Sequence, residues 1–257
     1  MAAVRRVVFN QKGGVGKSTI TVNLAAVAAQ AGRRVLVLDL DAQANASHYL
    51  LGVVPDDTGN GASGLFGQML NISLYARTPA EFVLPTRFER LSVLPAHPEL
   101  AELMPKLEQR YKMFKLREAL DMLSQEYDEI WIDTPPALNF YTRSALIAAS
   151  RCLIPFDCDA FSRQALYSLL AHVEEIRADH NPALAVEGIV VNQFQPRAAL
   201  PARLVGELRE EGLPVLEVPL SASVKIRESH EASCPMVHLD PRHKLAGEFM
   251  RLYARLA

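Results

Sequence analysis

The sequence is poor in cysteine, and its few cysteines are widely scattered. Cys152, Cys158 and Cys234 form no CxxC pair, and no histidine stands at zinc-ligand spacing from them. We therefore expect neither a disulfide framework nor a structural zinc site, which favours a cytosolic protein. Apolar runs are also short: none approaches the roughly 18 residues of a membrane span. Polar Asn10 follows Val7-Val8-Phe9 at once, which is not the pattern of a signal peptide.

An excess of charge of either sign is also absent. The 257 residues include 27 Lys and Arg against 29 Asp and Glu, and 49% are hydrophobic. Such a composition excludes a disordered chain, and 13 Gly with 16 Pro exclude a collagen-like one. Because the balance is nearly neutral, any binding of nucleic acid must come from a local basic patch.

What the sequence does contain is an alternation of short β-branched apolar runs with amphipathic segments. Consecutive Val, Leu and Ile residues are typical of strands buried on both faces. The expected strands are Val4–Asn10, Arg34–Leu40, Leu91–Leu94, Glu129–Asp133, Cys152–Phe156, Val186–Asn192 and Val215–Val218. The expected helices are Ser18–Ala31, with Ile20, Leu24, Val27 and Ala31 on its apolar face, then Tyr111–Tyr127, Phe161–His180, Leu200–Glu211 and Lys244–Leu256.

Strands separated by helices predict right-handed βαβ units. The fold class is therefore α/β, a three-layer sandwich with a mostly parallel twisted sheet. We expect a single domain over residues 1–257, with the glycine-rich segment Pro55–Gly67 as an exposed loop.

A glycine-rich segment joins the first expected strand to the first expected helix. Glycines let successive backbone N–H groups converge on an anion, and the helix N-terminus adds its positive dipole end. Within Lys12-Gly13-Gly14-Val15-Gly16-Lys17-Ser18-Thr19 we expect Lys17 to reach the β- and γ-phosphates and Ser18 to ligate Mg²⁺. Gln11 stands where the common GxxxxGK[ST] pattern has its first glycine, and Lys12 adds a second lysine. The alternative is a turn that binds no ligand.

Two acidic segments are expected at the same edge of the sheet. Asp39 and Asp41 end the second strand, and Asp133 ends the apolar strand of Ile130-Trp131-Ile132 before Thr134-Pro135-Pro136. Ligands in such folds collect beyond the carboxyl ends of the strands. Carboxylates there can hold metal-bound water and orient an attacking water, so the three segments together predict nucleotide hydrolysis. Asp39 and Asp41 could instead cap the next helix.

The sequence resembles the deviant Walker A ATPases of the ParA/MinD group, closest to ParA/Soj-like partition ATPases. Its loop fits their KGGxGK[ST] motif. The resemblance implies a P-loop NTPase fold, ATP and Mg²⁺ as cofactors, and an ATP-sandwich homodimer. It also implies that Lys12 is the signature lysine, which reaches the phosphates of the partner's nucleotide.

Residues 39–45 are similar to the family's DxDPQGN motif, with Ala42 in place of Pro and Ala44 in place of Gly. The resemblance implies that Asp41 is the catalytic aspartate, alongside Lys12 and Lys17. It places the metal at Ser18, Asp39 and Asp133, with Asp133 acting through water. The alanines leave the carboxylates in place and bear on the geometry of the loop.

The resemblance extends to the base site. Val190-Val191-Asn192-Gln193 is similar to the strand end whose Asn contacts adenine, and Val218-Pro219-Leu220 to the segment that closes over the base. Asn192 could also be an ordinary strand-terminating residue. The implied nucleotide-binding residues are Gly13, Gly14, Val15, Gly16, Lys17, Ser18, Thr19, Asn192 and Pro219.

Basic residues near the C-terminal third suggest DNA contact. Arg197 and Lys225 match positions at which ParA-like dimers hold DNA without sequence preference, and Arg227 lies in the same stretch without a clear counterpart. Such contacts to phosphates are electrostatic. Because Glu228 and Glu231 are close, a solvated charged face is the alternative. We expect a second basic cluster to be the exposed face of a helix: Lys106, Arg110, Lys112, Lys115 and Arg117.

The leading hypothesis is an ATP-dependent partitioning ATPase in the cytoplasm, on the nucleoid. It would dimerise on ATP, bind double-stranded DNA nonspecifically and hydrolyse ATP when stimulated by a ParB-like or other cargo adaptor. Since the chain begins close to its first strand, we expect no N-terminal helix-turn-helix domain and no operator binding.

Two alternative functions would require other features of the chain. A MinD-like membrane-positioning ATPase would need a detachable amphipathic tail, whereas Leu245–Leu256, with acidic Glu248, is expected to pack on the sheet. A metabolic ATP-dependent enzyme or an iron–sulfur reductase is the other. The reductase would need cluster cysteines, and none follows Asp133 in its segment.

Overall fold

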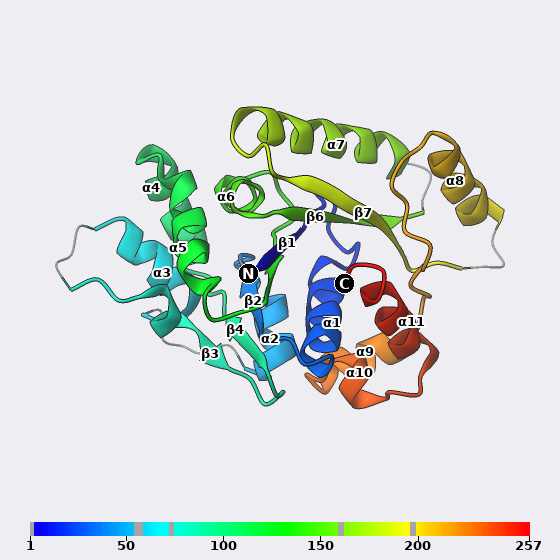
Figure 1. Ribbon diagram of the computed structural model, residues 1–257, viewed down its shortest axis with the longest axis horizontal. Helices are drawn as coiled ribbons and strands as arrows, with labels where there is room; N and C mark the ends of the chain where they lie inside the picture. Colours follow the sequence, from blue (N-terminus) through cyan, green and yellow to red (C-terminus); the bar gives the residue numbers. More distant parts are fainter. Residues whose placement is uncertain (1–2, 54–58, 72–74, 159–161, 196–198) are drawn as a thin grey trace.

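Seven strands form one twisted sheet in the computed structural model, which describes residues 3–53, 59–71, 75–158, 162–195 and 199–257 (Figure 1). The strand order is β3-β4-β2-β5-β1-β6-β7. Only the β3–β4 pair is antiparallel among the described strands. The strands are β1 (Val4–Val8), β2 (Val35–Asp39), β3 (Leu84–Pro85), β4 (Leu91–Leu94), β5 (Glu129–Asp133), β6 (Arg151–Asp157) and β7 (Ala185–Asn192).

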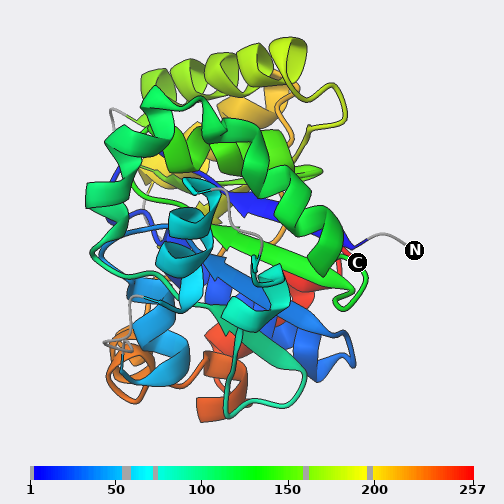
Figure 2. The same cartoon turned by 90° about the vertical axis from the view of Figure 1, so that its left-hand side faces the viewer.

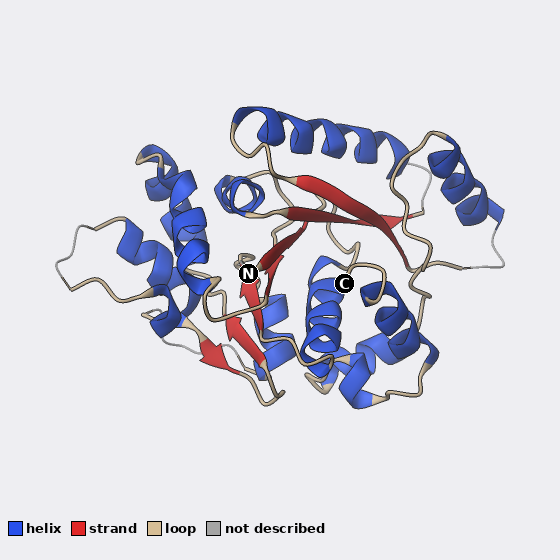
Figure 3. Ribbon diagram, in the orientation of Figure 1, coloured by secondary structure: helices blue, strands red, loops and turns tan. Residues whose placement is uncertain are grey.

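Helices cover both faces of the sheet (Figures 1 and 3). They are α1 (Lys17–Gln30), α2 (Asn45–Leu51), α3 (Gly61–Met69), α4 (Leu100–Gln109), α5 (Lys115–Leu123), α6 (Phe140–Ala148), α7 (Ser162–Asp179), α8 (Ala199–Glu210), α9 (Lys225–Glu231), α10 (Met236–Leu239) and α11 (Lys244–Tyr253). Successive strand residues enter opposite cores: Leu36 and Leu38 pack with α3 to α8, whereas Val35 and Val37 pack with α1, α2, α10 and α11. Figure 2 shows the two helical layers from the side, with the green helices above the strands and blue α1 and red α11 below them. The predicted α/β three-layer fold is confirmed.

The parallel register brings the predicted motifs together. Asp39 and Asp133 are direct partners on adjacent strands, and Asp133 is also the partner of Val8 on β1. The loop that follows β1 therefore begins next to both carboxylates. Six of the expected strands are present, with bounds that differ by two residues or fewer. The single domain over residues 1–257 stays a prediction.

The segment Pro55–Gly67 was expected to be an exposed loop, and this is wrong for its described part. Residues 54–58 lie outside the described residues, but α3 begins at Gly61 and its Phe66 is fully buried. The glycines serve close packing here. A Cβ on Gly61 would clash with the Pro95 carbonyl, and a Cβ on Gly64 with the Gly59 carbonyl.

Two other expected elements differ. Val215–Val218 is not a strand, because only Val215 bridges to Ile189 of β7. The N–H of Leu216 donates to Ile189 within this bridge, and the next hydrogen bond to β7 comes only from the N–H of Leu220; Pro219, between them, has no N–H to donate. The expected helix Tyr111–Tyr127 is shorter, since Tyr111 has a φ of 52° and α5 starts only at Lys115. The basic cluster is thereby divided between α4, a 3-10 turn and α5.

Helix α1 is buried on more than the one face expected from its sequence. All residues from Ile20 to Ala29 are buried, while Ala31, placed on the apolar face, is exposed. The reason is its position between the sheet and α2, α10 and α11 (Figure 1). Helix α11 packs into this core as predicted, with Leu245, Phe249 and Leu252 buried.

A buried charged cluster fixes the end of α11 to the sheet. Arg6 of β1 donates to Glu129 (2.8 Å), to Glu187 (2.8 Å) and to the carbonyl of Leu256 (2.6 Å). The hydroxyl of Tyr253 in α11 donates to the other oxygen of Glu129 at 2.6 Å. The side chains of Arg6 and Glu129 are only 4% and 7% exposed. This arginine therefore neutralises acidic groups that have little access to water.

We predict that Arg6→Ala lowers the free energy of unfolding by about 3–5 kcal/mol, because two largely buried carboxylates lose their cation. Urea unfolding followed by circular dichroism measures the change. Arg34→Ala is the matched control, since Arg34 pairs with Asp128 at the surface, where its side chain is 52% exposed. Its effect should be far smaller. Equal stability of the two variants would contradict the role assigned to the buried cluster.

Candidate nucleotide-binding site

The glycine-rich loop between β1 and α1 is held from the far strand of the sheet. Gly14 and Gly16 have φ values of 76° and 89°, which favour glycine. A Cβ on Gly16 would also clash with the side-chain amide of Asn192. That amide donates to the carbonyl of Val15 at 2.8 Å, and Gln193 donates to the carbonyl of Gly14 at 3.2 Å. The end of β7 thus shapes the loop directly.

Lys17 places a cation at the centre of the site. Its Nζ donates to the carbonyl of Lys12 at 2.9 Å, and the residue is only 7% exposed. Burial lowers the pKa of Lys17, and the negative charges of Asp133 and Asp41 oppose this shift. The ammonium therefore lies close enough to both carboxylates to interact with them.

The carboxylate of Asp39 accepts hydrogen bonds from the loop and helix that follow β2. One carboxylate oxygen accepts from the N–H of Asp41 (3.1 Å), and the other accepts from the N–H (2.9 Å) and the hydroxyl (2.7 Å) of Ser47. Burial raises the pKa of Asp39 to about 6, against these hydrogen bonds. Ala44, which stands where the resemblance has Gly, has a φ of 54°. The loop thus keeps the left-handed turn despite the substitution.

Asp133 contrasts with its neighbour. It is fully buried, and among the described residues neither carboxylate oxygen has a hydrogen-bond partner. Burial, and next the charge of Asp39, raise the pKa of Asp133, while Ser18 and Lys17 favour its charged form. An unpartnered buried carboxylate near a hydroxyl suits Mg²⁺, which takes one or two protein oxygens and completes its shell with water and phosphate oxygens. No group of three or more His, Cys, Asp or Glu in the described chain could hold a metal by itself.

A cavity of about 490 Å³ opens over the loop and receives most of the predicted catalytic residues. Asp41 lines it with one oxygen accepting from the N–H of Gln43 at 3.0 Å. The other predicted residues in its wall are Gly13, Gly14, Gly16, Lys17, Ser18 and Thr19. Val15 is buried behind the loop, and Lys12 is exposed with its Nζ 3.3 Å from Asp157.

Six residues of this cavity were not predicted as site residues: Gln43, Asn45 and Pro136, which lie in the predicted motif segments, and His48, Tyr49 and His230, which lie in none of them. The ring of His230 in α9 hydrogen-bonds the hydroxyl of Thr19 at 3.0 Å and meets the edge of Tyr49. No sequence spacing signals this contact, because α9 lies more than 200 positions after the loop. It ties the beginning of α1 to α9.

A second cavity of about 530 Å³ adjoins the first and shares Gly14, Gly16, Thr19 and His230 with it. Asn192 lies in its wall, as expected for a base-binding residue. Pro219 does not line it; residues 221–224, which follow, do. The shared residues make the two cavities parts of one elongated site.

The three DNA-contact residues have different settings. Arg197 lies outside the described residues. Lys225 begins α9 and pairs with Glu228 at 2.6 Å. Arg227 is exposed and lines the second cavity. Of the two described residues, both lie in α9, Lys225 in an ion pair and Arg227 at the cavity.

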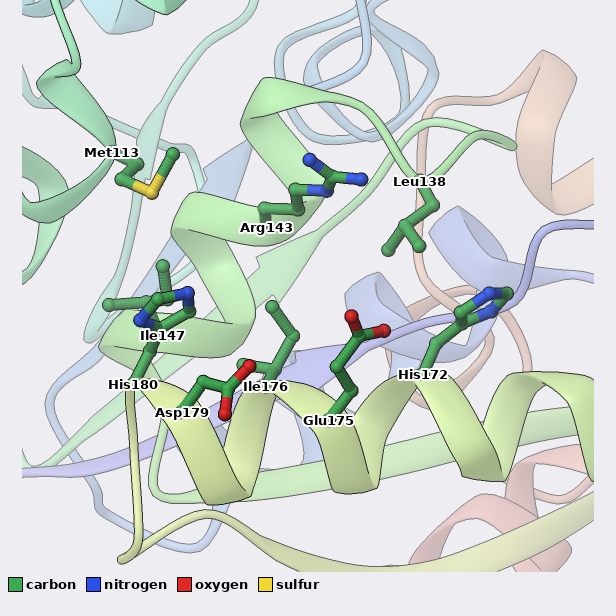
Figure 4. A pocket seen from close by; sticks show the side chains of 9 residues that line it. All are labelled: Met113, Leu138, Arg143, Ile147, His172, Glu175, Ile176, Asp179 and His180. Carbon is green, nitrogen blue, oxygen red and sulfur yellow. The ribbon is translucent and has the colours of Figure 1, made fainter.

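A third cavity, of about 120 Å³, lies between α6 and α7 (Figure 4). Figure 4 shows Arg143 and Glu175 extending from α6 and α7 around it. His172 lines it and hydrogen-bonds Gln11, which precedes Lys12, at 3.1 Å. None of the predicted site residues is in its wall. It is therefore not part of the nucleotide site.

A glycine-rich loop leading into a helix, a lysine at its end and acidic residues at adjacent strand ends define a P-loop nucleotide hydrolase. Residues 5–186 match the family model described as an AAA domain. The chromosome partitioning protein ParA of Myxococcus xanthus is 35% identical, covering 98% of this chain and 87% of the relative. The sporulation initiation inhibitor protein Soj of Bacillus subtilis is 30% identical, covering 97% and 96%.

The chain belongs to the ParA/Soj family of P-loop ATPases, which confirms the resemblance and the predicted ATPase class. Cobyrinic acid a,c-diamide synthase from Mycobacterium smegmatis, solved with an ATP analogue and magnesium, shares the fold with a TM-score of 0.84. It is 25% identical, and the match covers 99% of this chain and 94% of that one. The expected cofactors, ATP and Mg²⁺, are thus confirmed for this class of site. No helix in the described ranges is long and apolar enough to cross a membrane.

We predict that Asp133→Asn raises the free energy of unfolding of the nucleotide-free protein by about 0.5–2 kcal/mol near pH 8. The carboxyl has a raised pKa in the folded state, so its ionisation opposes folding as the pH rises above the ordinary value of 3.8. The gain should shrink as the pH falls from 8 towards 5. Urea titrations across this range measure it.

The same variant should lose most of the thermal stabilisation that ATP with Mg²⁺ gives the wild type, because Asp133 no longer supplies a carboxylate. Asp179→Asn, at an exposed position of α7, is the control and should change neither quantity. A less stable Asp133→Asn protein with normal Mg²⁺-ATP stabilisation would contradict the metal assignment.

Proposed function

We propose that this protein is a partitioning ATPase that binds Mg²⁺-ATP, dimerises around it and holds DNA nonspecifically until hydrolysis releases the dimer. The observation that carries the proposal is the buried Asp133 next to the phosphate loop, whose oxygens have no hydrogen-bond partner in the described part of the chain and whose charged form only nearby Ser18 and Lys17 favour. It leaves the site with an unmet need for a cation, which a magnesium nucleotide meets. The relatives named ParA and Soj support partitioning as the use of this chemistry.

The chain's own residues divide the work at the phosphates. The backbone N–H groups of the loop and the Nζ of Lys17 bind the phosphate oxygens. Ser18 and Asp133 hold the metal site, Asp133 through water, while Asp39 keeps the loop of Asp41 in place. Bound Mg²⁺ supplies charge that offsets the phosphates. Asp41, at the wall of the same cavity, orients the water that attacks the γ-phosphate.

Lys12 provides the contact between two copies. Its exposed side chain pairs with Asp157 across the surface of its own chain, and both side chains are partly exposed, 41% and 33%. A pair of this kind is weak, so phosphates of the partner's nucleotide can displace Asp157. Closure of the dimer then depends on ATP, because the phosphates supply the attraction.

DNA binding is assigned to Lys225 and Arg227 of α9, together with Arg197. The hydrogen bond between His230 and Thr19 joins this helix to the phosphate loop. Lys225 must exchange Glu228 for a DNA phosphate, which limits the affinity of one copy. The dimer doubles the number of cations. A cargo-bound adaptor of the ParB type then stimulates hydrolysis on nucleoid DNA in the cytoplasm.

Neither alternative function gains a specific observation. A membrane-positioning ATPase needs a releasable amphipathic helix, and the amphipathic segment considered for this role, α11, instead packs on α1 and is fixed by the Arg6 cluster. A metabolic enzyme shares the fold, as the diamide synthase does, but the ParA and Soj relatives, 35% and 30% identical, are named as partitioning and sporulation proteins. Stimulation of ATP turnover by DNA and an adaptor protein, and not by small metabolites, would distinguish a partitioning ATPase from a metabolic enzyme.

The primary experiment is co-sedimentation of the wild type with nonspecific double-stranded DNA in ATP, ADP or no nucleotide, all with Mg²⁺. We expect retention with ATP that falls steeply with salt, since the contacts are to phosphates. Equal retention in all three conditions would contradict an ATP-gated DNA-binding protein.

We predict that Asp41→Ala retains ATP binding and dimerisation but lowers ATP turnover by about 100-fold or more, because no group orients the attacking water. The variant should therefore stay on DNA in ATP for longer than the wild type. Phosphate release and DNA co-sedimentation measure the two effects. Asp128→Ala, at an exposed ion pair, is the control. Normal turnover by the Asp41 variant would remove this residue from the catalytic role.

We predict that Lys12→Ala binds ATP as a monomer within about threefold of the wild-type affinity but does not dimerise, because Lys12 contacts the partner's nucleotide. Light scattering after size exclusion and a nucleotide titration separate the two properties. Asp157→Ala is the matched control: it frees Lys12 from this ion pair and should leave dimerisation intact or stronger. An ATP dimer of the Lys12 variant would overturn the trans contact.

A further inference from the structure

The second cavity has the composition of a base-binding site. Leu245 and Phe249 of α11 give it an apolar wall, and the amides of Asn192 and Gln193 stand where β7 ends. Its volume of about 530 Å³ lies in the ordinary range of small-molecule sites. Because it shares Gly14 and Gly16 with the phosphate cavity, a nucleotide with its phosphates at the loop has its base here.

Residues 221–224 form the wall facing the end of β7. This segment has no regular secondary structure apart from an isolated bridge between Ser221 and Phe194. Phe194 donates its N–H to Leu220 at 2.9 Å and accepts from the N–H of Ala222 at 3.3 Å. One side of the segment is therefore fixed by the chain beyond β7.

The other side of the segment is fixed by a buried carboxylate of α11. Glu248, only 4% exposed, accepts from the N–H of Ser221 at 2.8 Å and from its hydroxyl at 2.7 Å, one bond to each oxygen. Lys244 donates to the same hydroxyl at 2.9 Å, and its Nζ lies 3.4 Å from Glu248. Both donors of Ser221 thus end on one side chain.

A buried carboxylate is costly unless it is fully used. Glu248 is absent from the catalytic cavity, and its hydrogen bonds serve the position of Ser221. The helix that carries it also packs on α1, which begins at the phosphate loop. Helix α11 therefore contacts both the helix that begins at the phosphate loop and the segment that forms the wall of the second cavity.

We propose that Glu248 is a positioning residue for base recognition, which holds residues 221–224 where their backbone groups distinguish a 6-amino from a 6-oxo purine. The inference rests on the proposed binding of ATP. Adenine presents a hydrogen-bond donor at the edge where guanine presents an acceptor. A fixed wall can therefore pair with adenine, whereas guanine is left with an unpaired polar group. A wall free to shift accommodates both.

The test compares the dissociation constants of ATP, GTP and inorganic triphosphate, each with Mg²⁺, by calorimetry. In Glu248→Ala we expect the preference for ATP over GTP to fall about tenfold or more, mainly through weaker ATP binding. Triphosphate, which fills the phosphate cavity alone, should bind within about twofold of the wild type. Glu248→Gln can still accept from the N–H of Ser221 and donate to its oxygen, so it should restore most of the preference. Glu217→Ala, at an exposed pair with Arg255 beyond α11, is the control.

The outcomes separate this inference from the proposed function. If Glu248→Ala weakens triphosphate as much as ATP, or leaves the ATP-to-GTP ratio unchanged, the positioning role is wrong. A wild type that binds triphosphate but does not prefer ATP to GTP would also overturn it. A wild type that binds neither triphosphate nor ATP would instead refute the proposed nucleotide function. Melting of each variant without nucleotide identifies a loss of folding, and Ser221→Ala then tests the same contact from the other side.

Discussion

Two carboxylates lie next to each other inside the protein, at the carboxyl ends of adjacent parallel strands. The register pairs Asp39 directly with Asp133, and both carboxylates are shielded from solvent. Burial raises the pKa of both groups. The protein resolves this for Asp39 with the hydrogen bonds of Ser47 and the N–H of Asp41. It leaves Asp133 without a partner among the described residues. The conflict makes a cation at this edge favourable, which is the physical reason to propose the metal site beside the loop with Lys17.

The cation must be held in place as well as attracted. The loop is fixed from β7 by Asn192 and Gln193, and the helix that follows it is enclosed by α2, α10 and α11. A side chain that crosses from the last strand of the sheet to the loop on β1 makes the two ends of the site mechanically continuous. The end of β7 is therefore joined to the phosphate loop by two direct side-chain contacts. The buried Arg6 cluster extends this continuity to the end of α11.

The sequence was sufficient to predict those parts of the site that depend on a local pattern of residues. The glycines of the loop, the lysine at its end and the acidic strand ends all have a local physical reason, and the parallel register then brings them together. It was insufficient to predict contacts between distant segments. No periodic pattern in the sequence indicates the contact of His230 with Thr19 or that of Glu248 with Ser221. The prediction of a loop around Gly61 was wrong for a related reason. Its glycines indicate a loop by composition, but Gly61 lets α3 approach the backbone at Pro95 and Gly64 lets it approach the backbone at Gly59.

The near neutrality of the chain bears on how DNA binding can depend on nucleotide. Each phosphate neutralised by a cation contributes about −0.9 to the slope of log affinity against log salt. The three cations assigned to DNA would give a single copy a slope of about −2.7, so its attraction would be weak at physiological salt. A dimer that presented both sets would have a slope of about −5.4 and would bind much more tightly, because its second set of contacts would form intramolecularly. With 29 acidic against 27 basic residues, the rest of the surface adds no attraction that would retain the monomer. In the proposed cycle, low overall charge is therefore a condition for release: hydrolysis that separated the two copies would be enough to return each one to solution.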